Sequence, residues 1–303
     1  MLSRKNKRLL MKCVSLFSVV RGYNIPIIFL AQYLSAIFIL AGDMRALHVL
    51  LDPLLLCIVL ASAITIASGY IINNFYDSQK DLINRPRKSL LDRLVSQGTK
   101  LRVYFTLNFI SVGIAFIVSW RAAAFFSVYI FLIWFYSHKV KKYLLVGNLM
   151  STLLAIFPFF AILLYYKNFE PVIFGHATFL WLLLLMREIV KDLENLTGDL
   201  ANNYHTIAVE YGESKSKQAF TTASVLTLIP VYLLIERYDV GYMDLYLYVS
   251  LIVLTVLNIL LWKKSEKSRY LLVHNGIKAL IVAGVFCIVL IDPGVLYHGK
   301  KLL

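Results

Sequence analysis

Two short acidic segments carry the residues of this sequence that are best suited to chemistry. In the first, NNFYDSQKDLINRPRK (residues 73–88), Asn73, Asp77 and Asp81 follow one another at four-residue intervals. Residues four apart share one face of a helix, so the spacing predicts a polar stripe of carboxylate and amide oxygens. Oxygen donors of this kind are the ligands of a hard divalent cation such as Mg²⁺.

The second segment, REIVKDLENLTGD (residues 187–199), has the same character. Asn195 and Asp199 are four apart, Asp192 comes one turn earlier, and Gly198 is expected to end or bend the helix. Two facing carboxylate stripes would repel each other unless a cation lay between them. Mg²⁺ would complete its shell with water and substrate phosphates, so the two segments predict a diphosphate site. The predicted metal ligands are Asn73, Asp77, Asp81, Asp192, Asn195 and Asp199, and the four aspartates are the predicted catalytic residues.

Cations surround both segments and could hold phosphate oxygens. A single D-x-x-x-D would be interpreted as a solvated helix end, but two such stripes on one side of a membrane favour a functional site, because acids beside a bilayer are costly. The cations predicted to hold phosphate are Lys80, Arg85, Arg87, Lys88, Lys139, Lys141, Lys142, Arg187 and Lys191.

The elements that must position these residues are membrane helices. The 303-residue chain is 59% hydrophobic and only 16% charged, and it contains repeated apolar runs near the roughly 20 residues of a bilayer span. No run resembles a cleavable signal peptide. We predict an all-α, polytopic bundle around a central cavity, with a basic segment at 1–24, a membrane domain at 25–292 and a tail at 293–303. The nine expected spans are 25–42, 53–75, 102–119, 121–137, 145–165, 172–190, 218–235, 243–262 and 274–291.

The positions of the cations predict the orientation of the bundle. If the amino terminus is cytoplasmic, that side receives 23 of the 31 Lys and Arg residues and the other side receives six. Lys and Arg accumulate on the cytoplasmic side, so the acidic segments are expected there, in the cell (inner) membrane. The net charge of +14 is then a topology signal with added attraction to lipid, and no nucleic-acid partner is expected. The 23 cations lie in residues 4–12, 80–102, 139–142, 187–217 and 263–269.

Four segments in order resemble a known family. NNFYDSQKD with its NRPR tail resembles the first aspartate-rich motif of the UbiA superfamily of intramembrane prenyltransferases, and REIVKDLENLTGD resembles the second. YSHKVKKYLLVGN (residues 136–148) is similar to the family's tyrosine-and-lysine loop, and TIAVEYG (residues 206–212) follows in the expected place. The likeness spans residues 21 to about 285. It implies that substrate binding also involves Arg21, Asn24, Tyr136 and Asn148.

The resemblance implies Mg²⁺-dependent transfer of a prenyl group from an allylic prenyl diphosphate to a lipophilic acceptor. The motifs are closest to the branch that prenylates geranylgeranylglycerol phosphate to form an ether lipid. An aromatic acceptor in quinone biosynthesis and a non-enzymatic, cation-coupled transporter are the alternatives. Whichever function is right, the ionisable Lys278 inside the last span needs a partner or a water-filled cavity.

Two asparagines depart from the family pattern. Asn74 and Asn195 stand where the family commonly has aspartate. An amide offers a carbonyl oxygen without negative charge, so we expect activity to be retained with a higher Mg²⁺ requirement. Position 74 lies about 100° around the helix from Asn73 and should reach the site only from its edge.

Overall fold

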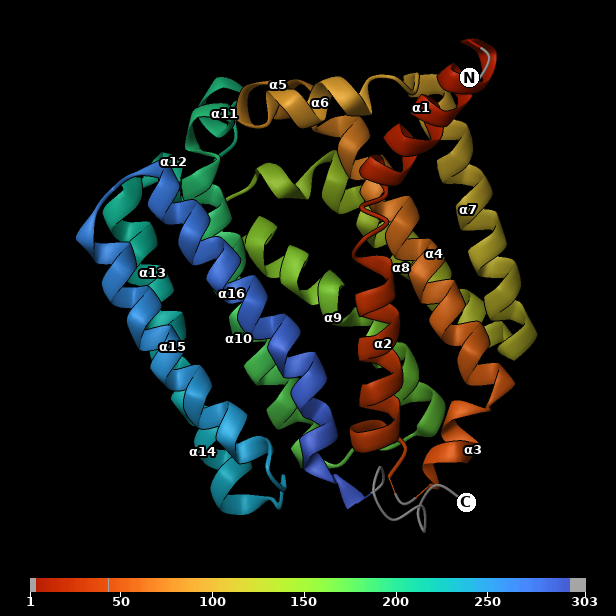
Figure 1. Ribbon diagram of the computed structural model, residues 1–303, viewed down its shortest axis with the longest axis vertical. Coiled ribbons are helices and arrows are strands. Elements are labelled where there is room, and N and C mark those ends of the chain that lie inside the picture. Colours follow the sequence, from red (N-terminus) through yellow and green to blue (C-terminus); the bar gives the residue numbers. More distant parts are fainter. Residues whose placement is uncertain (1–3, 43, 295–303) are drawn as a thin grey trace.

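The computed structural model describes residues 4–42 and 44–294, and its described part consists of helices and their connections (Figure 1). Within it, eight helices are long and apolar enough to cross a membrane. This arrangement confirms the predicted all-α membrane protein. The predicted tail, 293–303, lies almost entirely outside the described residues. The eight are α4 (Pro53–Tyr76), α7 (Gln97–Val118), α8 (Trp120–His138), α9 (Val146–Tyr166), α10 (Pro171–Glu194), α13 with α14 (Gly212–Arg237), α15 (Met243–Lys263) and α16 (Lys267–Cys287) with η3 (Ile288–Ile291).

Two of the nine expected spans differ from a simple helix. The first is α2 (Ile25–Ser35) followed by a π-helical turn, η1 (Ala36–Leu40), and is shorter than the other eight. The seventh breaks at Thr227 into α13 (Gly212–Leu226) and α14 (Leu228–Arg237). The Thr227 hydroxyl donates to the Ser224 carbonyl at 2.6 Å, and Pro230 falls in the first turn of α14, where no amide donor is needed.

A layer of short helices covers one end of the bundle. Figure 1 shows α5 (Ser78–Asn84) and α6 (Pro86–Asp92) lying across this end, between α11 (Leu196–Ala201) and α1 (Arg4–Val19). The layer also includes η2 (Val140–Lys142) and α12 (Ile207–Glu210), whereas α3 (Ala46–Leu50) lies at the opposite end. Both acidic segments run from the end of a long helix into this layer, so the fold places them at the same end of the bundle.

Helix α1 has the character of an interfacial helix. Leu10, Val14 and Phe17 repeat at helical spacing and are exposed, while Lys7 and Lys12 supply charge. Such a pattern is typical of a helix that lies in the plane of the membrane surface. The Ser18 hydroxyl donates to Asp92 at 2.8 Å and ties α1 to α6.

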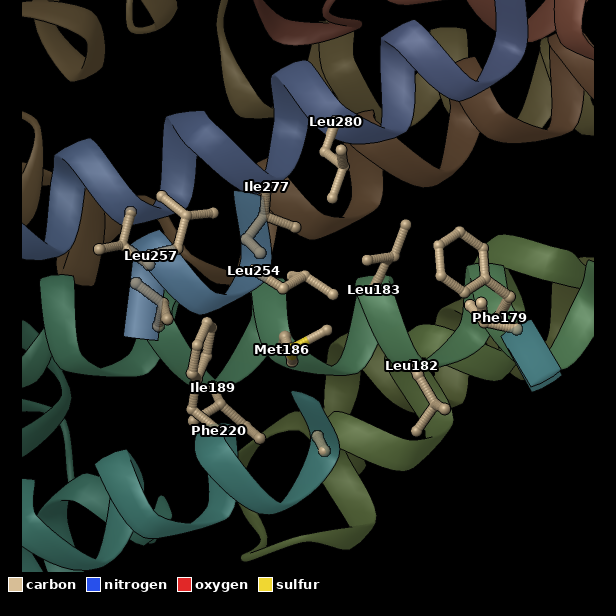
Figure 2. Close-up of a cluster of buried hydrophobic side chains, with 14 of the residues drawn as sticks. Phe179, Leu182, Leu183, Met186, Ile189, Phe220, Leu254, Leu257, Ile277 and Leu280 are labelled. Atoms are coloured by element: carbon tan, nitrogen blue, oxygen red, sulfur yellow. The ribbon is translucent and has the colours of Figure 1, made fainter. Parts of the chain in front are cut away.

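Two hydrophobic cores hold the long helices. In the first half of the chain, Leu55 and Val59 of α4 pack with Phe126 of α8 and Ile162 of α9. In the second half, α10 packs against α13, α15 and α16 (Figure 2). Helix α4 leads into the first acidic segment and α10 into the second, so each segment extends a helix that is anchored in its own core. The second core includes Phe179, Leu183, Met186, Ile189, Phe220, Leu254, Leu257, Ile277 and Leu280.

Candidate active site

The first acidic segment bends where α4 ends. Helix α4 stops at Tyr76, Asp77 forms its C-cap, and α5 begins at Ser78. The predicted polar stripe therefore does not lie on one continuous helix, because the helix is interrupted at Asp77. The one-turn spacing persists, because the Asp77 amide donates to the Asn73 carbonyl at 2.9 Å and the Asp81 amide to the Asp77 carbonyl at 2.8 Å.

Asp77 is neutralised by residues from elsewhere in the chain. Lys141 Nζ lies 2.6 Å from Asp77 Oδ1 and 3.3 Å from Asn73 Oδ1. The Tyr204 hydroxyl donates to the same Asp77 oxygen at 2.8 Å. Burial acts to raise the pKa of Asp77, but Lys141 and Lys80 outweigh it and hold that pKa below its usual value. Asp77 is therefore a stable carboxylate.

The second segment also bends, but at a different residue from the one expected. Helix α10 ends at Glu194 and Asn195 links it to α11, so the break is not at Gly198. Asp192 is buried, and its Oδ2 accepts from Asn148 Nδ2 at 2.9 Å. Asp199 has no exposed surface, so the second pair of acids is enclosed more deeply than the first.

Contacts between the two segments create one site. Lys80 Nζ lies 2.5 Å from Asp199 Oδ1 and 4.0 Å from the centre of the Tyr204 ring. Because Tyr204 also bonds Asp77, the Lys80–Tyr204 pair joins both stripes. Asn84 Oδ1 accepts from the Gly198 amide at 3.1 Å, across a separation of 114 residues. A Cβ atom at position 198 would lie 2.3 Å from Asn84 Nδ2, so any residue other than glycine would displace the Asn84 side chain.

The carboxylates of Asp199 and Asp81 are less fully compensated by nearby cations than the carboxylate of Asp77. Burial raises the pKa of Asp199 despite Lys80, and burial with the nearby Asp77 charge raises the pKa of Asp81. Apart from the ion pair with Lys80, neither buried carboxylate oxygen of Asp199 has a hydrogen-bond partner within the described part of the chain.

The donor set fits a hard cation, although the acids are not already gathered as one ligand shell. Within residues 4–42 and 44–294, no three His, Cys, Asp or Glu side chains are close enough to form a metal cluster. The available oxygens are those of Asp77, Asp81, Asp192 and Asp199, with the amides of Asn73 and Asn195. Mg²⁺ commonly binds one or two carboxylates and takes its other ligands from water and phosphate, so this set is sufficient.

Comparison with known proteins identifies the family. The model of the UbiA prenyltransferase family matches residues 34–277, which is most of the chain. The chain belongs to the UbiA prenyltransferase family. The predictions of a prenyltransferase and of a membrane helical bundle are thereby confirmed.

Relatives and solved structures of the UbiA family extend the match. The digeranylgeranylglyceryl phosphate synthase of Methanosphaera stadtmanae is 27% identical over 262 residues, which cover 86% of this chain and 88% of the relative. A solved structure of a digeranylgeranylglyceryl phosphate synthase aligns over 92% of this chain and 98% of its own, with a TM-score of 0.68 and 20% identity. A UbiA homologue from Archaeoglobus fulgidus, bound to GPP and Mg²⁺, has the same TM-score at 14% identity and covers 91% of this chain and 99% of its own. These structures share the fold.

The candidate site gathers part of the predicted substrate-binding set and leaves part outside. Lys80, Lys141 and Asn148 contact the acids directly. Arg87 and Lys139 are exposed and form no ion pair with any described residue. Arg87 lies on α6 with its side chain exposed, and Lys139 is the exposed C-cap residue of α8. Neither side chain therefore reaches the acids.

The other predicted residues lie around the edge of this centre. Tyr136 shares the electrostatic environment of Asp77 and Asp192. The Arg21 guanidinium lies 4.9 Å from the Tyr70 ring centre, and Asn24 Nδ2 is 3.5 Å from the Tyr70 hydroxyl.

Three predicted cations pair with glutamates of α10. Arg85 Nη2 lies 3.2 Å from Glu194 Oε1. Arg187 lies 2.8 Å from Glu188, and Lys191 pairs with the same glutamate.

Asn74 belongs to a separate buried network. It accepts from Lys100 Nζ at 2.8 Å and donates to Asp92 Oδ2 at 3.0 Å. Lys100 and Asp92 are both buried. The departure from the family pattern at position 74 therefore faces α6 and α7, away from Asp77.

Sequence reasoning missed several residues that assemble the site. Tyr204 contacts Asp77 across 127 residues, and Asn84 contacts Gly198 across 114. His274 Nδ1 lies 2.6 Å from Glu194 Oε2. Asn84 opens the NRPR tail of the first motif, but no role is predicted for it there. Tyr204 and His274 carry no motif of their own, although Tyr204 follows the second acidic segment closely enough to be suspected.

Proposed function

We propose that this chain transfers a geranylgeranyl group from its diphosphate to the hydroxyl of geranylgeranylglycerol phosphate. The acceptor is inferred from the motif resemblance and from relatives named digeranylgeranylglyceryl phosphate synthase. The observation that carries the reaction class is the Lys80–Asp199 contact, which joins two acidic segments at one end of an apolar bundle.

In the proposed reaction the acceptor hydroxyl oxygen forms a bond to C1 of the prenyl group. The bond from C1 to the diphosphate oxygen breaks, its electron pair leaves on diphosphate, and the hydroxyl proton passes to that diphosphate. Mg²⁺, held by Asp77, Asp81, Asp192 and Asp199 with Asn73 and Asn195, would neutralise charge on the leaving group. Neutralisation of developing charge in an enclosed site is the main catalytic contribution.

The chain's own cations share this role. Lys141 and Lys80 each lie beside a carboxylate of the site and carry ammonium groups that can bind phosphate oxygens. The low pKa of Asp77 keeps it charged, so it retains Lys141 in place.

An apolar cavity offers space for an isoprenoid chain away from water. It lies among α2, α9, α10, α15 and α16 and is lined by Ile39, Phe159, Phe179, Leu183, Tyr246 and Val285, among others. Exclusion of water would protect an allylic cation from hydrolysis.

We further propose that the amino terminus and the site face the cytoplasm across the cell membrane. The support is the excess of Lys and Arg on that side. Protease digestion of sealed vesicles of known orientation, followed by detection of an amino-terminal tag, tests this assignment.

The decisive assay uses the purified full chain in lipid nanodiscs with Mg²⁺ and labelled geranylgeranyl diphosphate. Geranylgeranylglycerol phosphate and aromatic quinone precursors serve as parallel acceptors. Product formed only with the glycerol phosphate supports the proposal. Product formed only with an aromatic acceptor would replace it with the quinone alternative.

A further inference from the structure

His274 is a buried residue of α16 that belongs to none of the sequence motifs. Its Nδ1 lies 2.6 Å from Glu194 Oε2, where α16 packs against α10. Because a carboxylate carries no proton, the hydrogen of this bond comes from His274 Nδ1. Lys278, one turn further along α16, is exposed and forms no ion pair with any described residue. His274, and not Lys278, therefore joins α16 to Glu194.

Glu194 has a different partner on each of its carboxylate oxygens. Oε2 accepts from His274, and Oε1 lies 3.2 Å from Arg85 Nη2. Arginine and carboxylate often pair through two parallel N–H···O bonds, because the planar geometries of the two groups match. Here the contact with Arg85 uses one nitrogen and one oxygen, since His274 occupies the oxygen that a second bond would need.

The single contact leaves most of the Arg85 guanidinium available to another anion. A guanidinium carries five N–H donors, and among the described residues Glu194 is the side chain that bonds it. The Arg85 side chain is 33% exposed, so the remaining donors are accessible. Phosphate oxygens are acceptors that a planar guanidinium binds well. Arg85 can therefore bond Glu194 and a phosphate group at the same time.

The connection between α5 and α6 places Arg85 beside both acidic segments. The Arg85 amide donates to the Asp81 carbonyl at 2.8 Å, so Arg85 follows Asp81 by one turn. The residue before it, Asn84, accepts from the Gly198 amide of the second segment. Glu194 is the last residue of α10, in the same segment. The guanidinium therefore lies where the two segments meet.

We propose that His274 is a positioning residue for the prenyl diphosphate, acting through Glu194 on Arg85. Because His274 occupies Glu194 Oε2, it keeps the Arg85 contact to a single bond and leaves the other guanidinium donors to the diphosphate. Without His274, Arg85 would pair with both oxygens of Glu194 and withdraw from the substrate. This inference rests on the proposed function for the diphosphate site, and it is independent of the acceptor.

The test measures binding of geranylgeranyl diphosphate to the full chain in nanodiscs, with Mg²⁺ and without acceptor. His274→Leu should weaken this binding by about tenfold, and should weaken binding of inorganic diphosphate by the same factor. His274→Asn should retain the wild-type affinity, because its side-chain amide can donate in place of Nδ1. Unchanged affinity in His274→Leu would overturn the proposal.

Tyr270→Phe is the matched control. The Tyr270 hydroxyl donates to Glu213 Oε2 at 2.7 Å from the same end of α16, one turn before His274, but Glu213 belongs to α13. This variant should lower the Tm about as much as His274→Leu and leave the diphosphate affinity unchanged. Equal losses of affinity in the two variants would show that the docking of α16 as a whole matters, and would overturn the specific role of His274.

A double-mutant cycle tests the route through Arg85. In an Arg85→Gln background, His274→Leu should cause no further loss of affinity, because the group that it positions is gone. The same loss with and without Arg85 would overturn this route. Prenyl transfer only to an aromatic acceptor would overturn the proposed function and leave the role of His274 standing, since that role is measured without an acceptor.

Discussion

The two acidic segments have similar spacing, but the fold gives their carboxylates different surroundings. Asp77 of the first segment is bonded by Lys141 and Tyr204, which come from two other connections. Asp199 of the second has one ion pair, with Lys80, and apart from that contact its buried oxygens have no hydrogen-bond partner among the described residues. Accordingly the pKa of Asp77 is lowered and that of Asp199 is raised. The sequence spacing determines where the acids lie on their helices, whereas contacts with residues from other parts of the chain determine how readily each carboxylate is charged.

The largest effect is expected from removing one carboxylate from either segment. Asp77→Asn and Asp192→Asn should each lower kcat by about 100-fold or more, because each removes charge that would bind Mg²⁺. Single-turnover assays at saturating substrate measure the loss. Asp239→Asn, outside both segments, should retain wild-type kcat. Intact turnover in Asp77→Asn would mean that only the second segment is needed.

A smaller effect should separate two neighbouring lysines of the same loop. Lys141→Gln should raise KM for prenyl diphosphate by about tenfold, because Lys141 lies within the site. Lys139→Gln should change it by less than about twofold, since that side chain is exposed. Steady-state assays at fixed acceptor compare the two variants. Equal changes would assign the loop a general role in topology.

The two asparagines that replace family aspartates should affect Mg²⁺ binding differently. Asn195→Asp should lower the Mg²⁺ concentration for half-maximal turnover by a few fold, because it adds a charge four residues before Asp199. Asn74→Asp should leave that concentration unchanged and lower the Tm, because it would lose its donor to Asp92 and place two carboxylates together. Mg²⁺ titration and thermal unfolding test both. A lower Mg²⁺ requirement in Asn74→Asp would place position 74 in the metal site after all.

The smallest expected effect concerns stability in the absence of Mg²⁺. A lowered pKa means that the Asp77 carboxylate contributes stability above its unfolded pKa, which is lost as pH falls through the folded pKa. A raised pKa means that the charged Asp199 costs stability once pH rises above the unfolded value, near 3.9.

At pH 7, Asp77→Asn should therefore lower the Tm by a few degrees and Asp199→Asn should raise it. The gain from Asp199→Asn should disappear as pH falls toward 4. Thermal unfolding in detergent with a chelator measures both changes. Destabilisation by both variants at neutral pH would show that the two segments share one electrostatic environment.

Periodicity and hydropathy were enough to predict the membrane helices and to predict that both acidic segments lie at the same end of the bundle. The four-residue spacing places Asp77 and Asp81 one turn apart even though the helix bends between them. The 100° offset of position 74 also predicts that Asn74 faces away from Asp77.

The remaining features depend on contacts that sequence spacing does not contain. Arg87 and Lys139 have the same charge as their neighbours Arg85 and Lys141, and only the direction of each side chain separates them. The Asn84–Gly198 contact depends on how two helices meet. The break at Thr227 depends on a local hydroxyl bond that competes with the helix.

The Asn84–Gly198 contact limits how this protein can change during evolution. A side chain at position 198 would collide with the Asn84 amide, so a substitution of Gly198 requires the side chain at position 84 to move or to be smaller. The two acidic segments, although far apart in sequence, are therefore coupled sterically at this contact. A chimera that joins residues 73–92 of one family member to residues 187–204 of another should fold best when the residues at positions 84 and 198 remain sterically compatible, as asparagine and glycine are here.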